Sequence, residues 1–313
     1  MMENSRAIFV PYLVGLALAF GVLGVIFAYS EWKMPAEEVV AVDTFDAFAD
    51  VEVAAKAAIV VDLTTGTVLY EKNADAQLPL ASLTKVPLVL AVSEVLRGDD
   101  TITIPYTTSY IGSAERLERG EVWRVEDLID YTLIASSNDG AAILAAAANS
   151  KVQDRFPTAP EDSATLWRMN SLAADLSLRS TYFLNVSGLD LSPTQSGAYG
   201  SARDMAKLFG YAASASASLF ASTAAEEMRL TAASGQAAAA VNTNEAQGDI
   251  TGLILGKTGY TDLAGGNLAV VFDVGLAHPV VVVVLGSTRD GRFMDVQKLV
   301  TAARASVTHE TAE

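Results

Sequence analysis

Residues 57–85 read AAIVVDLTTGTVLYEKNADAQLPLASLTK, and this stretch decides the fold. It opens with two runs rich in β-branched residues that flank the turn sequence TTG, a composition typical of a β-hairpin. A helical pattern then begins at Ser82 in SLTKVPLVLAVSEVL, with Pro87 in the first turns, where a helix tolerates proline best. The stretch therefore predicts a strand pair that leads into a helix.

The C-terminal part of the chain predicts more strands of the same sheet. NLAVVFDV at 267–274 and HPVVVVVLGS at 278–287 are typical of buried strands, and RFMDVQKLVTAARASV at 292–307 predicts a closing helix. Residues 100–235 look mainly helical, and the Ala-rich stretch YAASASASLFASTAAEEM within them has the propensity of surface helices. This order predicts an α+β fold: an antiparallel sheet from both chain ends, flanked by helices, with a mainly helical insertion.

An uncharged apolar run stands near the N-terminus. Residues 7–29 read AIFVPYLVGLALAFGVLGVIFAY, 23 residues that as a helix would extend roughly 34 Å, enough to cross a bilayer. Arg6 precedes the run and favours a cytoplasmic N-terminus with an exported remainder. We expect an uncleaved single-pass membrane anchor, and cleavage of a signal segment after Ser30 is the alternative.

The chain is accordingly divided into three parts. Residues 1–30 form the anchor or signal segment, residues 31–52 form an acidic spacer, and residues 53–313 form one folded domain. The expected location of that domain is the extracytoplasmic side of the cell membrane, or outside the cell if the first segment is cleaved.

Composition removes several classes of function. The 313 residues include 21 Lys and Arg against 37 Asp and Glu, a net charge of -16, and no long basic run, which argues against a nucleic-acid partner. There is no cysteine, and only two histidines occur, so a thiolate nucleophile, a His-rich metal site and a Ser-His-Asp triad are all disfavoured. We expect no metal and no cofactor, and a nucleophile would need a base other than histidine.

Ser82 and Lys85 are a candidate nucleophile and base. They stand three residues apart in ASLTK, so on the first turn of a helix both side chains lie on one face. A lysine amine must be neutral to take a proton, and its ordinary pKa of about 10.4 would have to be lowered by burial and by a nearby cation, for which Lys257 is the candidate. Taken alone, the pattern is more typical of a helix cap beside a surface lysine.

Two further motifs are polar breaks in apolar surroundings. SSN at 136–138 interrupts a helical pattern, which indicates either a helix boundary or a cleft. KTG at 257–259 precedes a strand pattern, and its glycine would allow another backbone to approach closely. A phosphate-binding loop is rejected, because its first glycine would fall on Thr251 and no helix follows the lysine.

Together and in this order, ASLTK, SSN and KTG resemble the S-x-x-K, S-x-N and K-T-G motifs of penicillin-recognising serine enzymes. The resemblance is strongest to the low-molecular-mass D-alanyl-D-alanine carboxypeptidases, peptidase family S11, and covers roughly residues 53–305. RMN, FLNVSGLD, YGSARDMAKL, NTN and GKTGYTDLAGGNL support it in the family's order. It implies a β-lactamase/transpeptidase-like fold with about five strands in the sheet.

The resemblance also implies catalytic roles. Ser82 would attack the carbonyl between two D-alanines and form an acyl-enzyme that water releases, with Lys85 as general base. Ser136 would relay a proton to the leaving amine, and Asn138 would hold Lys85 and a substrate carbonyl. Lys257 would supply positive charge and order the proton network.

Substrate binding by the same resemblance involves the third motif and an arginine. Thr258 would bind the terminal carboxylate, and Gly259 completes the motif beside it. The backbone N–H groups of Ser82 and Tyr260 would form the oxyanion hole. In GSTRDGR, Arg292 is preferred over Arg289 as the arginine near the carboxylate pocket.

The implied partners are peptidoglycan stem peptides, β-lactams as acylating inhibitors, and the membrane through residues 7–29. The expected activity is removal of the terminal D-alanine from pentapeptide stems. A D,D-endopeptidase that cuts cross-links would use the same motifs, and a non-catalytic wall-binding module is the non-enzymatic alternative. A β-lactamase is disfavoured because we find no convincing carboxylate motif between Asn138 and Lys257 that would activate the deacylating water.

No extra C-terminal β domain and no C-terminal amphipathic anchor are expected after the final helix. Arg203 and Asp204 are interpreted as structural residues.

Overall fold

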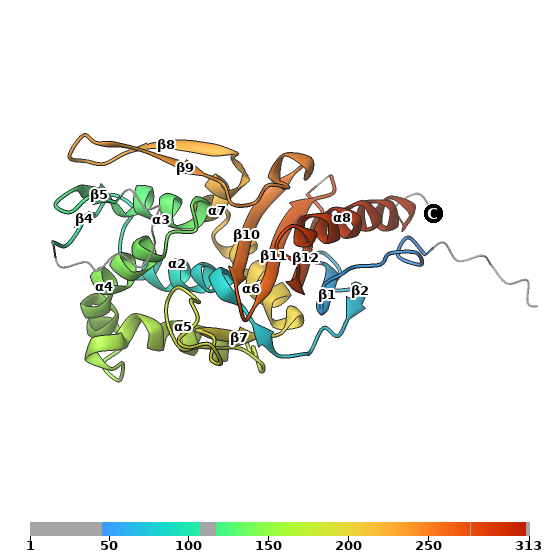
Figure 1. Ribbon diagram of the computed structural model, residues 1–313, viewed down its shortest axis with the longest axis horizontal. Coiled ribbons are helices and arrows are strands. Elements are labelled where there is room, and N and C mark those ends of the chain that lie inside the picture. Colours follow the sequence, from blue (N-terminus) through green and yellow to red (C-terminus); the bar gives the residue numbers. More distant parts are fainter. Residues whose placement is uncertain (1–45, 107–116, 276, 311–313) are drawn as a thin grey trace, which may run out of the picture. The chain divides into compact units, whose positions relative to one another are not determined.

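The computed structural model describes residues 46–106, 117–275 and 277–310, and its central sheet has the strand order β10-β11-β12-β1-β2 (Figure 1). All neighbouring strands are antiparallel. The strands are β1 Ala57–Asp62, β2 Val68–Lys72, β10 Leu253–Thr261, β11 Gly265–Asp273 and β12 Pro279–Ser287. Two strands come from the N-terminal hairpin and three from the C-terminal part, which confirms the predicted sheet and fold class.

Alternate residues of the central strands pack into cores on opposite faces of the sheet. Val270 and Val282 pack against α8, Gly291–Glu310, whereas Val271 faces the helical part through α6, Ala202–Ala215. Figure 1 shows α8 lying along β11 and β12. Because both faces are covered, these strands are unbroken apolar runs. Burial of each valine side chain contributes about 1.5–3 kcal/mol to the free energy of folding.

The remaining helices come from the part of the chain between β2 and β10. They are α2 Lys85–Ser93, α3 Val125–Ile134, α4 Asn138–Arg155, α5 Ala164–Asp175 and α7 Ala217–Phe220. α2 is buried from its first residue to Val92, as expected for a helix that is apolar on all sides. The ASLTK motif at the start of α2 is therefore placed by a core helix.

Three small sheets accompany these helices. One pairs β3 Leu78–Pro79 with β7 Ala198–Gly200 and β7 with β6 Tyr182–Phe183; another pairs β4 Thr101–Thr103 with β5 Val122–Arg124; the third pairs β8 Glu227–Thr231 with β9 Ala237–Val241. Ser234 at the tip of the third sheet's hairpin bonds the backbone of Val122.

The Ala-rich stretch departs from the expected surface helix at its C-terminal end. α6 ends at Ala215, short helical turns follow, and β8 begins at Glu227. In β9, which lies beyond this stretch, Ala238 and Ala240 are buried while their sequence neighbours are exposed, the alternation of a half-covered strand. Tertiary packing therefore overrides the helix propensity of alanine here.

The helix predicted from Ser82 also begins later. Ala81–Thr84 form a 3₁₀ turn, and α2 starts at Lys85. Ala81 has φ +48°, a left-handed conformation that is rare for alanine. Because residues three apart eclipse each other in a 3₁₀ turn, this start places the side chain of Lys85 directly over that of Ser82.

Residues 46–52, the end of the predicted spacer, pack onto the folded domain. The rings of Phe48 and Tyr70 stack with centroids 5.6 Å apart. Buried Asp295 of α8 accepts hydrogen bonds from the backbone N–H groups of Ala54 and Ala55. The predicted anchor at 7–29 lies outside the described residues, and none of the helices within the described ranges is long and apolar enough to cross a membrane.

Candidate active site

Ser82 and Lys85 meet at the start of α2. Lys85 Nζ donates hydrogen bonds to Ser82 Oγ and Asn138 Oδ1, both over 2.8 Å, and to the carbonyl of Ser187 over 3.3 Å. Lys85 is fully buried, at 0% exposure, whereas Ser82 is half-buried. An ammonium group has three N–H donors, which these oxygens can satisfy. After losing one proton, the amine can accept the Ser82 proton along the same contact, as a general base must.

The SSN motif forms the junction between α3 and α4. Ser137 caps α4, and its Oγ accepts a hydrogen bond from the N–H of Gly140 over 2.8 Å. Ser136 has φ +58°, a strained conformation for serine that often marks a functional site. The helix boundary explains Ser137, whereas Ser136 and Asn138 direct their side chains to the two lysines of the other motifs.

Lys257 extends from β10 into the same buried region. Its Nζ donates to Ser136 Oγ over 2.8 Å and to the Thr258 carbonyl over 3.0 Å. Burial lowers the pKa of Lys257 well below its ordinary value, and the positive charges of Lys85 and Arg292 lower it further. The sequence predicted a second cation near Lys85, and the structure places Lys257 within electrostatic reach of it.

At Gly259, strand β10 lies close to the 3₁₀ turn that carries Ser82. A Cβ atom at Gly259 would lie 2.8 Å from the carbonyl oxygen of Leu80 and 3.2 Å from the backbone nitrogen of Ser82, so a larger side chain would force the two segments apart. The next residue, Tyr260, is 44% exposed. The close approach accounts for the glycine of the third motif and puts Tyr260 next to the turn that carries Ser82.

The two candidate arginines occupy different environments. Arg292 is buried, and its Nη1 donates to the Gly259 carbonyl over 2.9 Å, while its Nε has no hydrogen-bond partner in the described part of the chain. Burial lowers the pKa of Arg292, and the charge of Arg289 adds to this effect. Arg289 is exposed and lies over the ring of Tyr260, 5.3 Å from its centroid. Arg292 thus bonds the backbone of the KTG motif, whereas Arg289 contacts the same strand through the exposed ring of Tyr260.

Comparison with known proteins bears directly on this cluster. The model of peptidase family S11, described as D-alanyl-D-alanine carboxypeptidase, matches residues 43–289. The chain belongs to peptidase family S11. It is 30% identical over 263 residues to D-alanyl-D-alanine carboxypeptidase DacA of Escherichia coli, which covers 80% of this chain and 60% of that protein. It is 34% identical over 158 residues to DacF of Bacillus subtilis, covering 49% of this chain and 37% of that protein.

Solved structures of similar fold agree with the S11 assignment. Penicillin-binding protein D2 of Listeria monocytogenes, solved in an ampicillin-bound form, is 28% identical, has a TM-score of 0.67, and is matched over 81% of this chain and 98% of its own. The D-alanyl-D-alanine carboxypeptidase of Mycobacterium tuberculosis is 26% identical with a TM-score of 0.68, over 81% of this chain and 92% of that one. This S11 chain spans between about a third and two thirds of the length of the curated carboxypeptidases that it matches.

Sequence reasoning missed the part of the S11 site that FLNVSGLD supplies. The Ser187 carbonyl in this loop accepts from Lys85, and Asn185 Oδ1 shapes the loop by accepting from the N–H groups of Ser187 and Gly188. Gly188 has φ +81°, and a Cβ there would lie 1.9 Å from the Ala81 carbonyl oxygen. The Asn-x-x-Gly spacing was the available signal for a turn, but not for a contact with Lys85.

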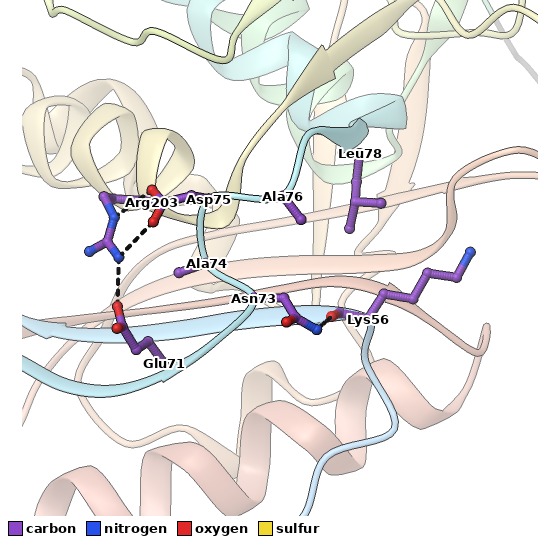
Figure 2. A pocket seen from close by; sticks show the side chains of 8 residues that line it. All are labelled: Lys56, Glu71, Asn73, Ala74, Asp75, Ala76, Leu78 and Arg203. Carbon is purple, nitrogen blue, oxygen red and sulfur yellow. Dashed lines mark hydrogen bonds and ion pairs between the residues drawn. The ribbon is translucent and has the colours of Figure 1, made fainter.

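The cavity in Figure 2 lies outside this cluster. It has a volume of about 540 Å³ and is lined by Lys56, just before β1, and by residues of β2, β3, the loop between them and α6. Arg203 there bonds Glu71 and Asp75 over 2.6 and 2.7 Å, which agrees with the structural interpretation of Arg203. Among the described residues, no group of three or more His, Cys, Asp or Glu side chains could hold a metal ion.

The adjacent serines of the SSN motif allow function and stability to be separated. Ser136→Ala should lower the rate of Ser82 acylation by labelled penicillin about 10²-fold or more, because it removes the expected proton relay, and it should also cost about 1 kcal/mol or more of stability, because the buried Lys257 Nζ loses an acceptor. Ser137→Ala should cost about 1 kcal/mol of stability through the lost cap of α4, with acylation almost unchanged. Acylation kinetics and urea unfolding of both variants measure the two effects, and the reverse pattern would contradict the assignment.

Proposed function

We propose that this chain is a serine-type D-Ala-D-Ala carboxypeptidase that removes the terminal D-alanine from peptidoglycan stem pentapeptides. The observation that carries the proposal is the 2.8 Å contact between Lys85 Nζ and Ser82 Oγ. Asn138 holds the same amine, and Lys257 bonds Ser136 beside it. This cluster supplies a nucleophile, a buried base and a proton relay without histidine.

The first half of the reaction is acylation. Lys85 takes the Ser82 proton as Oγ attacks the carbonyl between the two D-alanines, and the N–H groups of Ser82 and Tyr260 bind the developing oxyanion. The tetrahedral intermediate collapses as the C–N bond breaks. The proton passes from Lys85 through Ser136 to the leaving amine, so D-alanine departs with a neutral amino group and an ester remains on Ser82.

The second half is hydrolysis of that ester. Water attacks the acyl carbonyl while Lys85 accepts a proton from it, and the proton returns to Ser82 Oγ when the ester bond breaks. Lys257 keeps positive charge next to Ser136, where its Nζ lies 2.8 Å from Oγ. Thr258 and Arg292 are proposed to bind the terminal carboxylate of the substrate, because both belong to or contact the strand that passes Ser82.

The test of this function is release of D-alanine. The full-length chain should release one D-alanine per molecule of a pentapeptide ending in D-Ala-D-Ala, and Ser82→Ala should release none. Intact-mass spectrometry after penicillin treatment should show an adduct on the wild type that is absent from Ser82→Ala. Release by the wild type no faster than by a folded Ser82→Ala variant would overturn the proposal. Retained wall binding without acylation would favour the binding-module alternative.

An endopeptidase activity is the second candidate, because two relatives are named for it. The D-alanyl-D-alanine endopeptidase of Pseudomonas aeruginosa is 30% identical over 160 residues, which is 50% of this chain and 47% of that protein. Product analysis on cross-linked muropeptide dimers separates the two activities. Cleavage of dimers faster than of pentapeptide monomers would assign the endopeptidase.

β-Lactams are proposed as acylating inhibitors, and the membrane as the place of action. The first proposal is supported by the likeness to the ampicillin-bound Listeria protein, and the second by the apolar run at 7–29. The folded domain would then work on the extracytoplasmic side, or as a secreted protein if the segment is removed. The intact mass of the protein extracted from membranes distinguishes an uncleaved anchor from cleavage after Ser30.

A further inference from the structure

Two asparagines of the loop between β9 and β10 hold its backbone in place through hydrogen bonds. Asn242 Nδ2 donates to the carbonyls of Thr223 and Ala225 over 2.9 and 2.7 Å, and Asn242 Oδ1 accepts from the N–H of Asn244 over 2.9 Å. Asn244 is buried, and its Oδ1 accepts from the N–H of Ala246. These bonds hold the residue between the two asparagines, Thr243, in a fixed position.

Thr243 joins two parts of the active site. Its N–H donates to the carbonyl of Ile134, the last residue of α3, two residues before Ser136. Its Oγ1 lies 2.6 Å from Oγ1 of Thr258 in the KTG motif. Thr243 therefore connects the segment that carries the proton relay, through its backbone N–H, with the strand proposed to bind the substrate carboxylate, through its side chain.

The direction of this hydroxyl pair matters for carboxylate binding. Each threonine hydroxyl has one proton, so in a bonded pair only one can donate to the other. A carboxylate only accepts hydrogen bonds, and Thr258 can bind it strongly only if its own proton points at the substrate. Thr258 is 3% exposed, so water supplies few alternative partners for its oxygen. Thr243 must then donate to Thr258.

We propose that Thr243 is a positioning residue: its hydroxyl donates to Thr258 Oγ1 and thereby aims the Thr258 proton at the carboxylate of the substrate. The inference rests on the proposed function, because it assigns the carboxylate to Thr258. It adds to that function a residue that selects for substrates with a free carboxylate. A neutral substrate gains less from an aimed proton, since a hydrogen bond to a charged acceptor is roughly twice as strong as one between neutral groups.

The test compares a ligand with a carboxylate and the same ligand without it. Acylation of the full-length chain by benzylpenicillin and by its methyl ester is followed by intact-mass spectrometry. Thr243→Val, which keeps the side-chain shape, should slow acylation by benzylpenicillin about tenfold and acylation by the ester less than about twofold. Thr243→Ser, which keeps the hydroxyl, should restore most of the rate for benzylpenicillin.

Two further variants separate positioning from a structural effect. In a Thr258→Val background, Thr243→Val should add less than about a twofold effect, because the hydroxyl that it positions is gone. Thr223→Val is the matched control, because the Thr223 hydroxyl bonds Gly256 and Phe220 in the same region but does not contact Thr258. This variant should change the acylation rates of both ligands by the same factor.

The outcomes are decisive for the positioning role. Equal losses with both penicillins, no loss with either, or failure of Thr243→Ser to restore the rate would each overturn it. Because the assay measures acylation, a wild type that is acylated but releases no D-alanine would refute the carboxypeptidase activity while leaving the Thr243 comparison valid.

Discussion

A Lys85→Met variant should fold and yet leave Ser82 almost unacylated by penicillin, with the second-order rate constant lowered by a factor on the order of 10⁴. The Ser82 hydroxyl needs a base, and among the described residues Lys85 Nζ is the amine that bonds its Oγ, at 2.8 Å. The other nearby lysine, Lys257, donates hydrogen bonds to Ser136 Oγ and to the Thr258 carbonyl instead. Intact-mass kinetics with a labelled penicillin measure the loss directly.

Methionine is chosen because it retains an unbranched chain of similar length within the buried site. The change leaves the acceptor oxygens of Asn138 and Ser187 without this donor, but it also removes a buried charge, and these opposing effects should keep the variant folded. Lys151→Met, the same replacement at an exposed position of α4, is the matched control and should acylate normally. A folded Lys85→Met variant that acylates within about tenfold of the wild type would show that another group is the base.

The sheet and the three motifs could be predicted from the sequence because their signals are strong and local. Both-face burial turns β11 and β12 into unbroken apolar runs that no solvent-facing strand would show. The scarcity of histidine made a lysine the natural candidate for the base of Ser82. Those two features led to the correct fold class and to residues that the structure brings together.

What the sequence could not predict depends on contacts between distant segments. The 3₁₀ start at Ala81 goes with the close approach of Gly188, which is far away in the chain. The contribution of Ser187 to the Lys85 amine comes from a backbone carbonyl, a group that every residue has and no motif can mark. The β8–β9 hairpin consists partly of alanines whose intrinsic preference is helical, so only packing could reveal it.

The site residues divide in the same way. Ser136 and Asn138 belong to a motif, and the structure directs both side chains to lysines. Thr243 was visible only as the centre of NTN, and its contact with Thr258 requires β9 and β10 to be folded together. Arg292 was preferred over Arg289 from the resemblance alone, whereas its burial against Gly259 is a property that a seven-residue sequence does not encode.

The second large effect is expected at Lys257, where replacement should abolish function and increase stability. Lys257→Met should lower the acylation rate about 10²-fold or more, because the positive charge beside Ser136 is lost. The same variant should unfold with a free energy higher by about 1 kcal/mol or more, because burial and the positive charges of Lys85 and Arg292 disfavour a cation at position 257, and an apolar side chain avoids that cost. Urea unfolding and acylation kinetics on one preparation measure both changes.

The stability gain should depend on pH in a direction set by the lowered pKa of Lys257 in the folded protein. Between that lowered pKa and the ordinary value of 10.5, the unfolded chain binds more protons at this lysine than the folded chain does. The contribution of Lys257 to the free energy of unfolding therefore rises with pH across this window. The advantage of Lys257→Met should be largest below the folded pKa and should shrink as the pH approaches 10.5. Lys151→Met should show no such trend. A constant advantage of Lys257→Met would mean that the pKa of Lys257 is not lowered, and an advantage that grows with pH would mean that its oxygen partners stabilise the cation.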